Sequence, residues 1–133
     1  MKVEGRCHCG QVTFEADIDP GAVRICHCTD CQILSGTAFR VTVHTPAANF
    51  AVLTGRPKIY IKTADNGNKR AQAFCPECGT PLYATDAHEP KAYGIRVGAL
   101  KQRAELRPKN QIWHRSALSW VDDIGQMQRT DTQ

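Results

Sequence analysis

The sequence contains no long apolar run and few aromatic residues. No stretch approaches the roughly 18 consecutive apolar residues of a membrane span. The first residues, MKVEGRCHCGQV, lack the apolar core of a signal peptide, so we expect a cytoplasmic protein with no membrane partner. Hydrophobic residues make up 41% of the 133 residues and aromatic residues 7%. This number of apolar residues is enough for the core of a single domain over residues 1–133. Because the apolar fraction is somewhat low, such a domain would gain stability from additional cross-links.

Clustered positive charge is also absent. The formal net charge is +4, but no basic run is longer than Lys69-Arg70. If all seven cysteines bind two zinc ions as thiolates, seven negative and four positive charges reduce the net charge from +4 to +1. A nucleic-acid-binding surface needs clustered Lys and Arg. We therefore expect no nucleic-acid partner, and an adaptor for nucleic acid or the cytoskeleton is a minor alternative.

Long helical patterns are scarce, and short alternating segments between turn signals predict an all-β fold. The expected strands cover residues 10–18, 37–44, 49–55, 58–63, 66–74 (which opens with an Asn-Gly turn), 80–85, 91–100 and 111–116, and residues 22–28 return from a turn at 19–21. Helix is limited to a turn at about 29–35, capped by Thr29 or Asp30, and one near 99–106. We expect a core over about residues 3–124 and a flexible tail at 125–133.

The sequence contains seven cysteines, which fall into three groups: Cys7/Cys9, Cys26/Cys28/Cys31 and Cys75/Cys78. An odd number speaks against a complete disulfide framework. In a reducing compartment, clustered cysteines are more often metal ligands than disulfides. The grouping therefore indicates metal sites.

The pair in FCPECGTPLY has the spacing of a zinc knuckle, in which two sulfurs and the backbone of a tight turn face one ion. A structural zinc needs two more ligands. Cys7 and Cys9 lie at alternate positions of an extended segment, so their side chains point to the same side. We expect Cys7, Cys9, Cys75 and Cys78 to form a closed structural site, with Gly10 and Gly79 at positive φ behind the two pairs.

The remaining group supplies only three sulfurs. Cys26 and Cys28 share a side of the chain, Cys31 returns to it through the turn, and His27 points away. Asp30 more often caps such a turn than binds a metal. Three ligands and one open position are typical of a catalytic zinc. Three thiolates make that zinc a poor activator of water but a good binder of a further sulfur, so we expect a small thiol in the open position.

The order of these motifs resembles the glutathione-dependent formaldehyde-activating (GFA) enzyme family, which includes centromere protein V-like proteins. The motifs are GRCHCGQVTFE, ICHCTDCQILSGTAF and AFCPECGTPLY, followed by IRVGAL and QIWHRSALSWVDD. The resemblance spans roughly residues 3 to 124. It implies a β-tent fold of packed antiparallel sheets with two zinc ions, one structural and one at Cys26, Cys28 and Cys31.

The resemblance also implies an activity: a carbon–sulfur lyase run in reverse, in which a glutathione-like thiol adds to formaldehyde or another small aldehyde. The candidate proton donors for the new alkoxide are Ser35, His27 and His114. Arg24, Arg40 and Arg96 are candidates for binding a glutathione carboxylate. Trp113 and Trp120 fit core or rim packing better than the wall of a ligand cleft. The alternative is a non-catalytic two-zinc structural or ligand-binding module, and the sequence indicates no oligomeric state.

Overall fold

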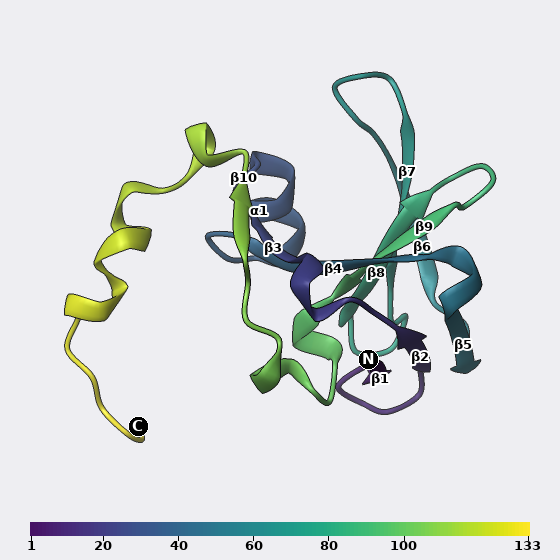
Figure 1. The fold of residues 1–133 in the computed structure, drawn as a ribbon, viewed down its shortest axis with the longest axis horizontal. Coiled ribbons are helices and arrows are strands. Elements are labelled where there is room, and N and C mark those ends of the chain that lie inside the picture. Colours follow the sequence, from purple (N-terminus) through teal and green to yellow (C-terminus); the bar gives the residue numbers. More distant parts are fainter.

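The computed structural model describes residues 1–133, which form two β-sheets (Figure 1). The smaller sheet has the order β1-β2-β5, with β1 at Lys2–Arg6, β2 at Thr13–Asp17 and β5 at Phe50–Thr54. The larger sheet has the order β10-β3-β4-β9-β8-β7-β6. Its strands are β3 (Val23–Cys26), β4 (Arg40–Pro46), β6 (Lys58–Thr63), β7 (Lys69–Phe74), β8 (Pro81–Asp86), β9 (Ala92–Arg96) and β10 (Asn110–Ile112).

Neighbouring strands run antiparallel, except for β10, which pairs with β3 in parallel. The single α-helix is α1 (Thr29–Ser35). Short 3₁₀ turns cover Pro20–Ala22, Ala47–Asn49, Val97–Ala99, Arg103–Glu105, His114–Ser116 and Ser119–Gln126. The expected mostly-β class with packed antiparallel sheets is confirmed. No helix of the chain is long and apolar enough to cross a membrane.

The apolar core lies between the two sheets and follows the alternation of the strands. In β2, Phe14 and Ala16 are buried and the alternate residues are not, as expected for a strand with one buried face. Phe14 packs so closely under Gly5 of β1 that a Cβ at Gly5 would lie 2.0 Å from the Phe14 ring. The core cluster also includes Val3, Val12, Val23, Val43, Leu82, Ile95 and Leu100.

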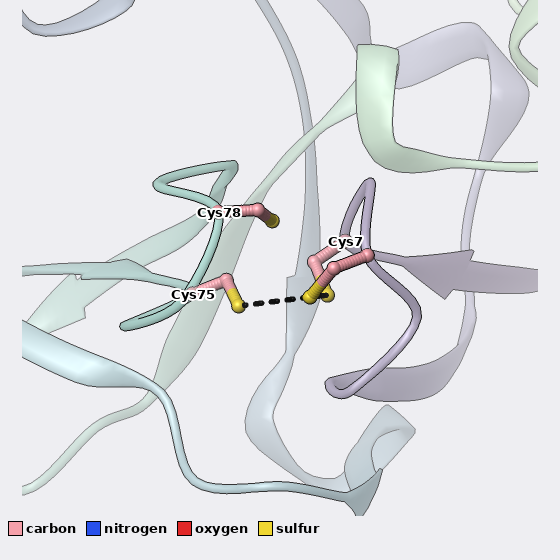
Figure 2. Close-up of side chains that lie close together, drawn as sticks. Cys7, Cys75 and Cys78 are labelled. Carbon is pink, nitrogen blue, oxygen red and sulfur yellow. Dashed lines mark hydrogen bonds between the residues drawn. The ribbon is translucent and has the colours of Figure 1, made fainter.

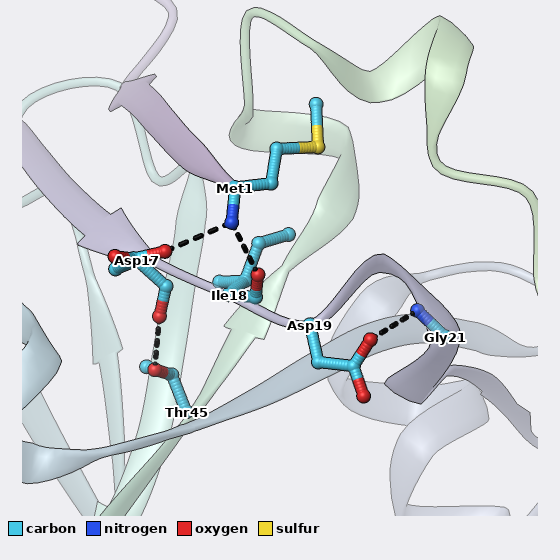
Figure 3. A network of polar contacts seen from close by, with 6 residues as sticks. All are labelled: Met1, Asp17, Ile18, Asp19, Gly21 and Thr45. Carbon is cyan, nitrogen blue, oxygen red and sulfur yellow. Dashed lines mark hydrogen bonds and ion pairs between the residues drawn. The ribbon is translucent and has the colours of Figure 1, made fainter.

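Strand β1 was missing from the sequence prediction, because a segment with Val3 as its one large apolar side chain carries a weak pattern. The structure holds it by pairing with β2 and by contacts at the chain end (Figure 3). The Met1 ammonium donates to Asp17 Oδ1 at 2.9 Å and to the Ile18 carbonyl oxygen at 2.8 Å. Thr45 of β4 donates to the Asp17 carbonyl oxygen at 2.5 Å, which ties the two sheets together.

The two faces of the larger sheet differ in chemistry. In β4, Val43 and Thr45 are buried toward the smaller sheet, so Arg40, Thr42 and His44 project from the opposite face. The hairpin of β6 and β7 extends this face, and its turn places Gly67 at φ 85°, as the Asn-Gly prediction required. The face opposite the core is therefore polar and carries basic side chains.

Helix α1 connects β3 to β4 and begins at a cysteine. The predicted cap, Thr29 or Asp30, was wrong: the Cys28 side chain is the cap and its sulfur accepts the Cys31 N–H at 3.3 Å. A sulfur placed before the helix can accept this N–H because the first helical N–H groups lack carbonyl partners. Gly36 ends the helix at φ 67°, a left-handed conformation that glycine adopts readily.

The C-terminal third departs most from the prediction. The strand expected at 91–100 ends at Arg96, and the helix expected at 99–106 is replaced by short 3₁₀ turns. The strand expected at 111–116 stops at Ile112, because Trp113 takes a left-handed conformation with φ 56°. The segment Ser119–Gln126 and the chain end extend away from the sheets (Figure 1).

Candidate metal centres and the adjoining cavity

The first candidate centre joins the end of β1 to the turn after β7. The Sγ atoms of Cys7, Cys9, Cys75 and Cys78 all lie within 4.8 Å of one another. Figure 2 shows the side chains of Cys7, Cys75 and Cys78 converging from two loops that are far apart in the sequence. The Cys9 sulfur lies 3.5 Å from that of Cys7 and 3.7 Å from that of Cys75. The structure thus brings together the four sulfurs that the sequence grouped.

The turns around this cluster have the expected glycine geometry. Gly10 and Gly79 follow the two cysteine pairs at φ 84° and φ 74°. Polar groups point at the sulfurs: the Val12 N–H donates to Cys7 Sγ at 3.2 Å. The Thr80 hydroxyl lies 3.1 Å from Cys78 Sγ, and this hydrogen bond lowers the pKa of Cys78 to about 5. A thiolate held by such donors is the form that binds zinc.

The second candidate centre lies where β3 leads into α1. Cys26 ends the strand, Cys28 caps the helix and Cys31 lies in its first turn, and their sulfurs lie within 4.8 Å of one another. The hydrogen bond between Cys26 and Cys31 lowers the pKa of Cys26 to about 5 and raises that of Cys31. The pair thus shares a proton, and a bound cation would displace it.

No other His, Cys, Asp or Glu side chain joins these three sulfurs. His27, between two of them in sequence, is buried, and its Nε2 donates to the Gln111 side chain at 2.6 Å. Asp30 forms an ion pair with Lys62 of β6. The chain therefore offers three ligand atoms at this centre, against four at the first.

A cavity of about 260 Å³ adjoins the three-sulfur centre on the polar face of the larger sheet. Cys26 and Cys31 line it together with five basic side chains and one histidine: Arg24, Arg40, Arg70, Arg96, Lys62 and His44. Neutral side chains, among them Thr42 and Gln72, complete the lining. The cavity is therefore strongly cationic beside a cluster of sulfurs.

Burial and the surrounding arginines shift the pKa values of two lining side chains. Burial is the main cause that lowers the pKa of His44 to about 4, with Arg24, Arg70 and Arg96 adding to it. His44 is therefore neutral near pH 7, and its Nε2 accepts a hydrogen bond from Arg24 at 2.7 Å. Burial also lowers the pKa of Arg96 to about 9, assisted by the charge of Arg40.

Both centres fit zinc by the chemistry of their donor sets. Four sulfurs at mutual contact distance match the closed tetrahedral set of a structural ion. Three sulfurs without a fourth ligand from the chain match a set with one open position. The free sulfurs pack side by side with no disulfide among them.

A comparison with protein families agrees with this donor pattern. The family model described as "Glutathione-dependent formaldehyde-activating enzyme" matches residues 2–116. The chain belongs to this GFA family. Among solved structures, the chain is similar to a Rhodobacter sphaeroides protein known from its crystal structure, with a TM-score of 0.63 and 20% identity. That match covers 81% of this chain and 98% of the other, and at this identity it shows the fold.

The other site residues predicted from the sequence of this GFA protein fall into two groups, those that line the cavity and those that do not. Arg24, Arg40 and Arg96 all line the cavity. The Ser35 hydroxyl instead donates to the Cys31 carbonyl oxygen at 2.5 Å, within its own helix. His114 is exposed and packs edge-on against the His27 ring, with centroids 5.5 Å apart.

The two tryptophans lie outside the core, at 44% exposure for Trp113 and 46% for Trp120. Arg115 stacks over the Trp113 ring. Trp120 lines a shallow apolar groove with Ile33 and Phe39 instead of the cationic cavity. They therefore pack at the surface, which agrees with the rim alternative of the prediction and not with core packing.

Sequence reasoning missed His44, Arg70 and Gln72, which complete the cavity. The alternation in RVTVH, residues 40–44, carried one usable signal, because it puts Arg40, Thr42 and His44 on one face. Arg70 and Gln72 come from β7, and only the strand order of the sheet brings β7 near β4. The local residue patterns of the strands do not predict this strand order.

Proposed function

We propose that this GFA-family protein is a zinc-dependent enzyme that forms a carbon–sulfur bond by adding a glutathione-like thiol to formaldehyde or another small aldehyde. The observation that carries the proposal is the contrast between the two cysteine clusters. One has four sulfurs, whereas the other has three and adjoins a cavity. A purely structural zinc site would be more stable with a fourth ligand, and the chain supplies none beside Cys26, Cys28 and Cys31.

The sulfurs of Cys26, Cys28 and Cys31 would hold a zinc ion, which supplies an open coordination position and keeps a thiol in that position deprotonated near neutral pH. The chain's own contribution is to position the reactants and to supply charge. Arg40 faces the cavity opposite Cys26, where its guanidinium stabilises negative charge on the carbonyl oxygen as the new bond forms. The thiol proton ends on that oxygen, so no redox partner is needed.

Of the three candidate proton donors, two are occupied. Ser35 donates to a helix carbonyl, and His27 donates to Gln111. His114 makes no side-chain hydrogen bond and lies at the surface beside His27. These contacts support His114 over the other two as a proton donor.

The test is a native mass spectrum of the purified protein with and without glutathione. We expect two zinc ions and one glutathione per chain, with one zinc and the glutathione lost in Cys28→Ser. Ser35→Ala is the matched control, because Ser35 lies in the same helix but bonds to its own backbone. Two zinc ions with no uptake of glutathione would contradict the proposal and favour the alternative, a non-catalytic two-zinc module.

A rate measurement completes the test, because thiols and formaldehyde also combine without an enzyme. The wild-type protein should accelerate the addition above this background, and Cys28→Ser should return it to the background rate. Equal rates for the two proteins would show that the three-sulfur centre is not used for the reaction.

A further inference from the structure

The cavity beside the three-sulfur centre holds more positive charge than the chain neutralises. Of its basic side chains, Arg70 pairs with Asp86 and Lys62 pairs with Asp30. Arg24, Arg40 and Arg96 have no acidic partner within 4.0 Å. Three guanidinium groups therefore share this wall without a carboxylate.

Two of these three arginines are buried. Arg40 and Arg96 are each 8% exposed, and the Nε atom of each is buried without a hydrogen-bond partner. Arg40 makes no hydrogen bond from its side chain, whereas Arg96 donates to Gln72 at 2.6 Å and to the Gly94 carbonyl oxygen at 3.3 Å. Burying a charged group without a partner is costly. A pair of such groups facing one cavity therefore indicates that an anion completes the site.

The neighbouring sulfurs do not account for all of this charge. Three thiolates with one divalent cation carry a single net negative charge, and a bound substrate thiolate raises it to two, which leaves one guanidinium of the three without an anion. Formaldehyde is neutral before it reacts and supplies no anion for it. The excess positive charge therefore indicates a bound anion other than the metal centre, and this anion is not formaldehyde.

The size of the cavity limits the anion. At about 260 Å³, it lies below the range of roughly 300–1,000 Å³ that is usual for pockets of drug-sized ligands. This volume suits a molecule of a few carbon atoms better than a whole tripeptide such as glutathione. Gly94 lines this space and packs against His44, because a Cβ there would lie 3.1 Å from His44 Nε2.

We infer that the cavity binds the carboxylate of a small carbonyl substrate, an aldehyde that carries a carboxylate directly on its carbonyl carbon. This inference rests on the proposed function and names its substrate class. Arg40 and Arg96 pair with the carboxylate, since a guanidinium matches a carboxylate in a two-bond fork. The thiolate forms a bond to the carbonyl carbon, the carbon–oxygen π bond opens and the thiol proton passes to the oxygen, so the step is redox-neutral.

The position of the arginines favours the aldehyde over the thiol as the source of this carboxylate. Arg40 is paired with Cys26 across β3 and β4, and directly opposed residues have Cβ atoms about 5 Å apart. In the expected product, the carboxylate of the aldehyde is bonded to the carbon that carries the sulfur. In glutathione, each carboxylate is separated from the sulfur by a peptide linkage and several carbons. An anion site next to the sulfur cluster therefore suits the aldehyde.

The test measures binding of glycolate, an unreactive analogue of such an aldehyde, to the zinc-loaded protein by calorimetry. Glycolamide, its neutral counterpart, is the ligand control. We expect glycolate to bind, glycolamide to bind at least about tenfold more weakly, and Arg40→Gln and Arg96→Gln each to weaken glycolate about tenfold or more, as loss of a charged hydrogen bond implies. Arg56→Gln, an exposed arginine away from the cavity, should have no effect.

If a glutamine variant fails to fold, Arg40→Lys replaces it, because lysine keeps the charge but cannot form two parallel hydrogen bonds. Arg40→Lys should bind glycolate measurably but more weakly than wild type and Arg56→Gln do. Equal binding of glycolate by wild type and the Arg40 variants would overturn the inference. Displacement of glycolate by glutathione would also overturn it, since the anion site would then belong to the thiol.

The outcome separates this inference from the proposed function. The protein should accelerate the addition of glutathione to glyoxylate more than its addition to formaldehyde, and Arg96→Gln, which removes only a contact to the carboxylate, should reduce the glyoxylate rate selectively. Acceleration with formaldehyde but no glycolate binding would remove the inference and leave the proposed function. Glycolate binding without acceleration of either addition would remove the proposed function, and with it the assignment of the ligand as a substrate.

Discussion

Arg40 lies directly opposite Cys26 in the antiparallel pairing of β3 and β4, with both side chains lining one cavity. A buried guanidinium is thereby held next to a sulfur that belongs to the three-cysteine centre. The two residues are positioned by backbone hydrogen bonds of adjacent strands, so their proximity does not depend on a flexible loop. The metal centre and the cationic cavity form one continuous site.

The two cysteine clusters should respond differently to mutation. Cys75→Ser should prevent stable folding, because this sulfur is fully buried and the four-sulfur centre joins β1 to the turn after β7. Cys28→Ser should lose one zinc ion while the fold is largely kept, because serine is itself a favoured helix cap and can accept the same N–H. Circular dichroism melting and zinc content measure both effects. Equal collapse of the two variants would contradict the division into a structural and a reactive site.

Removal of metal by a chelator should occur in two stages. The three-sulfur centre borders a cavity and has three ligands, so we expect its zinc to leave first with the far-ultraviolet spectrum unchanged. Loss of the second zinc should coincide with unfolding. The released zinc is followed with a chromogenic indicator while circular dichroism is recorded on the same sample. Simultaneous release of both ions with unfolding would show that the centres are not independent.

Gly5→Ala should destabilise the smaller sheet, because the new Cβ would overlap the Phe14 ring at distances of 2.0 to 2.4 Å. Overpacking of this kind costs about 1–3 kcal/mol. Gly98→Ala is the matched control, since no atom lies within 4 Å of its added Cβ, and it should change the free energy of unfolding by less than about 0.5 kcal/mol. Urea unfolding of the zinc-loaded proteins measures the difference. Similar stabilities for the two variants would contradict the close packing of β1 on β2.

His44 should make stability depend on pH in mildly acidic solution. Its folded-state pKa of about 4 lies below the ordinary histidine pKa of 6.5, so the unfolded state binds more protons between these values. Stability is therefore full above about pH 6.5 and falls as the pH decreases toward about 4. Allowing for solvent screening of a partly exposed ring, the loss is on the order of 1 kcal/mol.

His44→Gln removes this titration and keeps a polar side chain, so its unfolding free energy should fall less than that of wild type over the same pH range. The difference between the two proteins is the relevant quantity, because protonation of zinc-bound sulfurs affects both. Parallel pH profiles would show that His44 titrates normally in the folded protein.

Several features of this protein follow from local sequence alone. The spacing Cys-x-Cys puts two sulfurs on one side of an extended chain, and Cys-x-x-Cys with a following glycine closes a tight turn. The positive φ angles at Gly10 and Gly79, the Asn-Gly hairpin and the grouping of the sulfurs agree with these rules. Such rules work because they involve only neighbouring residues and the covalent geometry between them.

Tertiary structure decided the rest. Strand β1 forms because it can pair with β2 and pack on Phe14, although its own pattern is weak. The left-handed conformation of Trp113 ends β10 where the residues alone predicted a longer strand. The cationic cavity draws its arginines from β3, β4, β7 and β9, which are brought onto one sheet only by the strand order of the larger sheet. Sequence therefore determined which atoms could bind a metal, whereas long-range strand pairing decided which charges surround it, because pairing energies are summed over the whole sheet rather than over any one segment.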